Sequence, residues 1–249
     1  MQLYFIRHGQ SINNARWESD EYSNYDRESD PALTEKGFRQ AEQLALYLSR
    51  DKKEDSLETD IQNREGFGLT HLYSSLMIRA IQTGTIVSER LGIPLVGLPE
   101  AHEVGGIYLE VLNGGVTEIT HEHGVTPNYL RRKYPNMQLS KPIEDKGWWK
   151  GGREENDMPL KRAGIVLQYL KERHFGSDDR VGIITHGGFF NYMMRELLQI
   201  APEEPDNRKL SYWLSYCNCA ISRFDLVNNR IIFAYHNRTD FLDDELVSC

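Results

Sequence analysis

The feature that most constrains this chain is a repeated alternation of short apolar runs with amphipathic segments of helical period. The apolar runs at residues 3–6, 71–73 and 181–185 have the length and composition of buried strands. Each run leads into a polar loop, and an amphipathic segment follows. Strands that alternate with such helices predict an α/β fold, in which one sheet is covered by helices on both faces.

Four segments carry the helical pattern. Thr34 is placed to cap the first helix. Five apolar side chains are predicted to share one face of it: Phe38, Ala41, Leu44, Ala45 and Leu48. The other helices are expected at about 79–91, 157–173 and 189–199.

The rest of the chain is predicted from its polarity and its turn residues. Three segments interrupt the alternation: a polar loop over 10–32, a charged and exposed insertion over 51–68, and an irregular cap over 104–153. Two final strands near 219–226 and 230–236 are joined by Asn228-Asn229, which is typical of a hairpin turn. We interpret the 249 residues as a single domain, 1–249, that carries the cap as an insertion.

Composition excludes several classes of function. The 37 acidic and 29 basic residues give a formal charge of -8, so no broad nucleic-acid-binding face is expected. No apolar run approaches the roughly 18 residues of a membrane span, and the pattern of the N-terminal residues is not typical of a signal peptide. Cys217, Cys219 and Cys249 are a poor disulfide framework, so free thiols are expected at Cys217 and Cys219. A cytoplasmic setting, or the nucleus in a eukaryote, is the simplest interpretation.

Charged and imidazole side chains follow three of the predicted strands. Arg7-His8 follows the first strand, Ser74-Ser75 with Arg79 follows the second, and His186-Gly187 follows the third. In open α/β sheets, ligands bind beyond the carboxyl ends of the strands. Two arginines and two histidines at one such edge suit a phosphate dianion, and a histidine kept neutral among arginines is a nucleophile.

Five blocks in this order resemble the signature of the histidine phosphatase superfamily, which includes the cofactor-dependent phosphoglycerate mutases. The blocks are Arg7-His8-Gly9-Gln10-Ser11-Ile12-Asn13-Asn14, Asp30-Pro31-Ala32-Leu33-Thr34-Glu35-Lys36-Gly37, Ser74-Ser75-Leu76-Met77-Ile78-Arg79-Ala80-Ile81-Gln82-Thr83, Glu103, and Thr185-His186-Gly187-Gly188. Together they span nearly the whole chain. The resemblance implies a mainly parallel sheet, a phosphohistidine intermediate, and no metal or other cofactor.

The resemblance also implies roles for individual residues. His8 would be the phosphorylated nucleophile, and Glu103 would exchange a proton with the leaving group and with water. The phosphoryl group and the rest of the substrate would be held by the remaining matched residues: Arg7, Arg79, His186, Asn14, Gly187 and Gln10. Glu100 is the alternative proton donor.

Departures from the family pattern bear on the reaction. Mutases carry their acid within Glu-Arg-His-Tyr-Gly, whereas this chain reads Glu103-Val104-Gly105-Gly106-Ile107. Hydrolysis of a phosphate monoester is therefore preferred to mutase chemistry. The third hypothesis is a non-catalytic phospho-ligand module or a scaffold subunit. Two smaller departures are His102 before the acid, and Gly152-Arg153-Glu154 in place of a commoner Gly-Glu-Ser.

The remaining motifs leave the substrate open. Trp148-Trp149 is expected to pack the cap, with a substrate-pocket wall as the alternative, and Arg131-Arg132 is expected on a solvated face rather than at a second anion site. His121-Glu122-His123 is interpreted as solvated loop rather than a metal site. The expected partner is a small-molecule phosphate ester or a phosphoprotein, with no nucleic acid and no membrane. The oligomeric state is left open.

Overall fold

A seven-stranded sheet forms the centre of the computed structural model, which describes residues 1–19, 27–51, 60–113, 116–155, 157–199, 212–228 and 230–249. Its strands, in spatial order, are β6 (Gln138–Leu139), β3 (Leu95–Gly97), β2 (His71–Ser74), β7 (Arg180–Thr185), β1 (Gln2–Arg7), β8 (Ile221–Val227) and β9 (Arg230–Arg238). The first five strands of this order run parallel, β8 pairs antiparallel with β1, and β9 pairs antiparallel with β8. The predicted α/β sheet is therefore confirmed.

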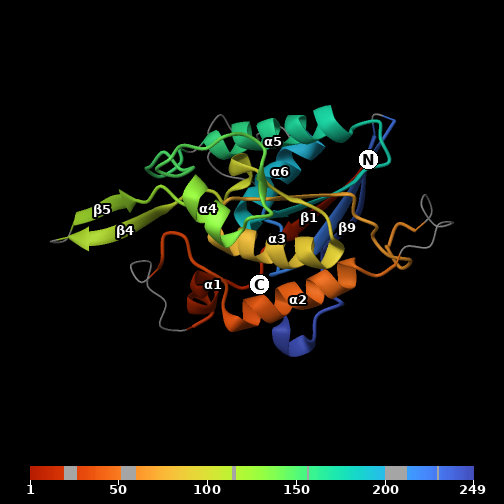
Figure 1. The fold of residues 1–249 in the computed structure, drawn as a ribbon, viewed down its shortest axis with the longest axis horizontal. Coiled ribbons are helices and arrows are strands. Elements are labelled where there is room, and N and C mark those ends of the chain that lie inside the picture. The colour runs from red at the N-terminus through yellow and green to blue at the C-terminus, as the bar shows by residue number, and fades with distance from the viewer. Residues whose placement is uncertain (20–26, 52–59, 114–115, 156, 200–211, 229) are drawn as a thin grey trace.

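Helices cover both faces of this sheet (Figure 1). α2 (Glu35–Leu48) and α3 (Ile78–Leu91) lie on one face, and α5 (Met158–His174) and α6 (Gly187–Leu198) lie on the other. β1 is buried on both sides because its successive side chains alternate between the two cores: Leu3 and Phe5 join one, and Tyr4 and Ile6 join the other. Within the described ranges, no helix combines the length and apolarity needed to cross a membrane.

The segment predicted as a polar loop over 10–32 contains a short helix, α1 (Ile12–Trp17). Ser11 and Asn14 form a capping box at its start, in which each side chain accepts from the backbone N–H of the other. The prediction of loop alone was wrong here because six helical residues bury too little apolar surface to leave a periodic pattern. Residues 20–26 of this segment lie outside the described residues.

The segment predicted to be irregular over 104–153 is more ordered than its glycines and prolines indicated. β4 (Tyr108–Asn113) and β5 (Val116–His121) pair as an antiparallel hairpin that projects from the body of the molecule (Figure 1). α4 (Pro127–Lys133) follows, and β6 then pairs with β3 at the edge of the main sheet. Short helical turns at 99–101 (η3) and 244–246 (η4) complete the elements.

Two predictions of exposure were wrong. Within the insertion expected over 51–68, Asn63 and Phe67 are buried, because Phe67 packs against Tyr4 and Tyr47 while Asn63 accepts from Arg223. Residues 52–59 lie outside the described residues. On α2, Phe38 is 37% exposed, because the buried face is centred on Gly37, Gln40 and Leu44. In the predicted hairpin turn Asn228 has a positive φ of 49°, and Asn229 lies outside the described residues.

The expectation of free thiols was wrong for Cys217, which forms a disulfide with Cys249. Residues 242–249 pack back across α2. A hydrogen bond from the backbone N–H of Asn218 to the backbone carbonyl of Ser248 brings the two cysteines together. A pairing across 32 residues leaves no local spacing signal. Cys219 is a free and fully buried thiol, as expected.

Gly37 is a position where the fold requires a residue without a side chain. A Cβ atom there would lie 2.1 Å from the backbone oxygen of Gln10. We expect Gly37→Ala to lower the free energy of unfolding by about 1–3 kcal/mol, because neither backbone segment can move away cheaply. Urea unfolding followed by circular dichroism measures the change.

Gly164→Ala is the matched control, since Gly164 also lies inside a helix and its added Cβ would approach Glu196 no closer than 3.5 Å. That variant should be unchanged or more stable, by about 1 kcal/mol at most. Equal destabilisation of both variants would contradict the close approach of Gly37 to the backbone of Gln10.

Candidate active site

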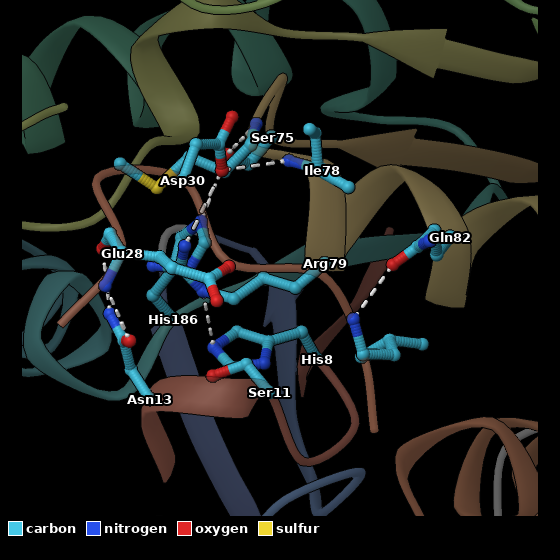
Figure 2. Close-up of polar contacts among 12 residues, drawn as sticks. His8, Ser11, Asn13, Glu28, Asp30, Ser75, Ile78, Arg79, Gln82 and His186 are labelled. Atoms are coloured by element: carbon cyan, nitrogen blue, oxygen red, sulfur yellow. Dashed lines mark hydrogen bonds and ion pairs between the residues drawn. The ribbon is translucent and has the colours of Figure 1, made fainter. Parts of the chain in front are cut away.

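The parallel strands β1, β7 and β2 end at the same edge of the sheet and bring their terminal residues together. Arg7 is in register with Thr185, and Ser74 is in register with Ile184. Backbone hydrogen bonds extend this register by one residue, from the His8 amide to Thr185 O and from the Ser75 amide to Ile184 O. The predicted meeting of His8 with Arg79 and His186 is seen directly (Figure 2).

His8 is buried and held in one orientation. Its Nδ1 lies 2.6 Å from the carbonyl oxygen of Gly9, and Nε2 lies 3.1 Å from Nε of Arg79. Because a carbonyl can only accept, Nδ1 carries the proton and Nε2 keeps its lone pair. Burial, together with the charges of Arg79 and Arg7, holds the pKa of His8 well below 6.5. The ring is therefore neutral at physiological pH.

Arg79 connects His8 to a buried carboxyl group. Its Nη1 lies 3.6 Å from Oδ1 of Asp30, and the same oxygen accepts from the Ile78 amide at 3.0 Å (Figure 2). The Asp30 side chain is only 5% exposed. Burial raises the pKa of Asp30 to about 6, although the Arg79 charge acts in the opposite direction.

Arg7 is the second guanidinium beside the nucleophile. Its Nη1 donates to the carbonyl oxygen of Tyr216, while its buried Nε has no acceptor among the described residues. Burial lowers the pKa of Arg7 below its ordinary value, and the nearby Arg79 charge lowers it further. A guanidinium with an unsatisfied donor beside a histidine nucleophile is suited to take an anionic oxygen.

His186 lies next to His8. Its ring centroid is 5.0 Å from that of His8, and its Nε2 is 2.9 Å from Oγ of Ser75. Its Nδ1 is buried without a partner in the described part of the chain. Burial and the Arg79 charge hold its pKa well below 6.5, so both imidazoles are neutral.

Glu103 lies over the N-terminus of α6. Its Oε1 accepts from the amides of Val104 and Phe189, each at 2.8 Å, and Oε2 accepts from Gly188 at 3.1 Å. A Cβ atom on Gly188 would lie 2.5 Å from Oε1, so only glycine leaves room for this carboxylate. The negative charge of Glu103 also acts on Arg7, raising its pKa against the effect of burial.

The backbone that carries Glu103 is fixed by a buried ion pair. Arg162 contacts both carboxylate oxygens of Glu154, at 2.7 and 2.8 Å, and donates to the carbonyl oxygens of Glu100 and His102. Glu154 also accepts from the Gly105 amide. The Gly152-Arg153-Glu154 departure from the family pattern therefore supplies a carboxylate that ties down the loop around Glu103.

Two cavities meet at these groups. The smaller, about 220 Å³, is bordered by Arg7, His8, Arg79 and Glu103. The larger, about 590 Å³, shares Arg7 and Glu103 and continues past the exposed ring of Trp213. A phosphoryl group therefore fits beside the nucleophile, and the rest of a substrate has room to extend outward.

The three predicted substrate-binding residues occupy different positions. Asn14 borders both cavities, although its Oδ1 accepts from Ser11 and Asn218. Gly187 borders the larger cavity at the start of α6. Gln10 is buried and borders neither cavity, because its side-chain amide is bonded to Glu18 and Thr34.

Other candidates lie away from the cavities. Glu100 forms an ion pair with Lys141 and borders neither cavity, which favours Glu103 as the acid. The pair Arg131-Arg132 is exposed on α4. Trp148 and Trp149, which belong to the cap, pack against His102. His121 and His123 are exposed, with His121 at the end of β5.

Asp30 and Ser75 are site residues to which the sequence analysis assigned no role. Both lie inside matched blocks, so the family resemblance marked their positions. Their contacts with Arg79 and His186 depend on segments far apart in sequence, and only the structure shows them.

Comparison with known proteins agrees with this geometry. Residues 3–239 match the family model described as Histidine phosphatase superfamily (branch 1). A protein of Yersinia pestis (strain Pestoides F) named "Probable phosphoglycerate mutase GpmB" is 30% identical over 227 residues, which cover 90% of this chain and 85% of that protein.

Solved structures share the fold at lower identity. Bacillus stearothermophilus YhfR is 20% identical with a TM-score of 0.56, and the match covers 96% of this chain and 98% of that one. A phosphoserine phosphatase from Entamoeba histolytica, solved in complex with phosphoserine, is 17% identical with a TM-score of 0.53, over 97% and 98% of the two chains. The match to the family model, the relative at 30% identity and the convergence of His8, Arg79 and His186 lead to one conclusion: this chain belongs to the histidine phosphatase superfamily.

Proposed function

We propose that this protein is a phosphomonoester hydrolase that works through a phosphohistidine on His8 and uses no metal ion. The observation that carries the proposal is the protonation and orientation of the His8 ring. It is buried and neutral, its Nδ1 proton is bound to Gly9 O, and its Nε2 lone pair faces a guanidinium at the wall of a cavity. A neutral imidazole in that state is an activated nucleophile beside the charge that an attacked phosphate requires.

The reaction has two balanced steps. His8 Nε2 attacks phosphorus, the bond from phosphorus to the ester oxygen breaks, and Glu103, reacting in its protonated form, gives its proton to the departing alkoxide. A water molecule then attacks the phosphohistidine, Glu103 takes its proton, and the N–P bond breaks to release inorganic phosphate and free His8. Arg7 and Arg79 stabilise the charge on the transferring group in both steps.

Arg79 must change partners for this chemistry to begin. In this structure its Nε donates to the His8 nitrogen that attacks. A phosphate dianion offers the guanidinium stronger, charged acceptors. Binding of the phosphoryl group would therefore free the lone pair of His8 at the moment when its target is in place.

The substrate class and the cap are further parts of this proposal. We propose a small phosphorylated metabolite or a phosphoprotein as substrate, because the larger cavity opens outward beyond Glu103. We also propose that residues 1–249 act as one catalytic domain, in which 104–153 serves as the cap.

Mutase chemistry is the second candidate, because the relative at 30% identity is named a phosphoglycerate mutase. Against it, Arg131 and Arg132 lie outside both cavities. A screen over phosphorylated metabolites, run beside a primer-dependent assay for interconversion of 2- and 3-phosphoglycerate, separates the two. Phosphate release without interconversion supports the hydrolase, and interconversion without release supports the mutase.

His8→Ala should lower kcat for p-nitrophenyl phosphate by about 10⁴-fold or more, because the covalent route is lost. Labelled substrate should leave acid-labile phosphate on the wild-type protein and none on the variant. His121→Ala, which changes an exposed imidazole on β5, is the control and should keep wild-type activity. Turnover by a folded His8→Ala protein would contradict the assignment of the nucleophile.

Glu103→Gln should slow alkyl phosphates by about 10²-fold or more while changing p-nitrophenyl phosphate far less, because only a poor leaving group needs its proton. Steady-state kcat values for the two substrate types give the ratio. Glu100→Gln is the matched control, since Glu100 borders neither cavity. Equal losses of kcat on both substrate types, or a selective loss in Glu100→Gln, would show that Glu103 is not the general acid.

Asp30→Asn should affect activity in a pH-dependent way. Below pH 6 the Asp30 carboxyl is neutral, since its pKa is raised to about 6, so wild type and variant should have similar kcat/KM at pH 5. Above pH 7 only the wild type carries the charge that holds Arg79, and the variant should be about three- to tenfold less active. The measurement is the ratio of kcat/KM from pH 5 to 8, in which substrate ionisation cancels; a ratio independent of pH would refute the coupling.

A further inference from the structure

Two histidines and one carboxylate meet at the amino-terminal ends of β2 and β7, at the opposite end of these strands from the catalytic cavity. They come from three elements: His71 begins β2, His174 ends α5, and Asp179 precedes β7. One nitrogen from each histidine and a carboxylate oxygen of Asp179 all lie within 4.8 Å of one another. The proposed reaction uses none of them.

We propose that His71, His174 and Asp179 form a binding site for a zinc-class divalent cation that clamps these three elements together. Imidazole nitrogens with one carboxylate are typical ligands of Zn²⁺ and of its neighbours Co²⁺, Ni²⁺ and Cu²⁺, whereas Mg²⁺ and Ca²⁺ prefer all-oxygen sites. A water molecule would complete four-coordination. The site is independent of the proposed hydrolase chemistry.

The least mobile ligand is already oriented. The His174 side chain is 4% exposed, its Nδ1 is 2.9 Å from Asp179 Oδ2, and its Nε2 is 2.9 Å from the Tyr73 hydroxyl. For Nδ1 to bind a metal, the ring proton must lie on Nε2 and be donated to Tyr73. Such outer hydrogen bonds fix the tautomer and the direction of metal-binding histidines.

Asp179 and His71 complete the geometry. His71 Nδ1 lies 3.8 Å from Asp179 Oδ1, and the ring centroids of His71 and His174 are 4.5 Å apart. Tetrahedral ligands at about 2.0–2.1 Å from zinc lie about 3.4 Å from one another. The His71 side chain is 43% exposed, so it can rotate to close the remaining gap.

Residues of the catalytic site are remote from this cluster along the same strands. His71 is at the start of β2 whereas Ser74 and Ser75 are at its end, and Asp179 precedes β7 whereas His186 follows it. A cation here would therefore hold the end of α5 onto β2 and β7 and would raise thermal stability without entering the reaction.

The test is a calorimetric titration of metal-free protein with zinc chloride, together with thermal melts with and without zinc. Wild type should bind one equivalent more than His71→Ala, and zinc should raise Tm by several degrees in wild type but not in that variant. His71→Ala removes a half-exposed side chain, so it should fold. Asp179→Asn keeps an acceptor for His174 and should weaken zinc binding by about tenfold or more.

His121→Ala is the control, because His121 and His123 form another pair of close imidazoles that, in the described part of the chain, belongs to no group of three possible metal ligands. It should bind zinc and respond in Tm as wild type does, and magnesium chloride should shift no Tm. Equal zinc stoichiometry in wild type and His71→Ala, or no zinc binding by wild type, would overturn the proposal. A magnesium response equal to that of zinc would overturn the assigned metal class.

Discussion

Parallel pairing of β1 with β7 and of β7 with β2 is the constraint on which the site depends. The register places Arg7 opposite Thr185 and Ser74 opposite Ile184, so the three strands end at the same level of the sheet. The strands are short and buried, and a slip of two residues in either pair would displace the residues at one strand end by more than about 6 Å. Packing of both faces by helices is what fixes that register.

Within that frame, burial decides the protonation of the reacting groups. His8 and His186 are neutral because desolvation and two guanidinium charges disfavour a third positive charge. The same low-dielectric setting leaves Asp30 with its pKa near 6 although it faces Arg79. A cationic pocket that holds its histidines neutral suits transfer of a dianionic group, since attraction for the substrate and nucleophilicity then come from different side chains.

Much of the fold and the centre of the site could be predicted from the sequence because both rest on local patterns. Apolar runs that end in Arg7-His8 and His186-Gly187 specify strands and their terminal residues, and the matched blocks specify their order. Burial of Phe67 and pairing of Cys217 with Cys249 could not be predicted, because each depends on contacts between distant segments. Gln10 shows what a motif alone leaves open: it lies in a matched block, but its side chain is hydrogen-bonded to Glu18 and Thr34 and borders neither cavity.

The projecting hairpin of β4 and β5 has a consequence for how recognition could diversify on this scaffold. The chain leaves the sheet after β3, forms the hairpin, and returns through β6 to pair with that same strand. Both anchor points are therefore set by main-chain bonds, while β4 and β5 project from the body of the molecule (Figure 1). Hairpins of other lengths or sequences could be grafted between these anchors with the catalytic strands left in place, which makes 108–121 a segment that the fold can exchange without disturbing the site.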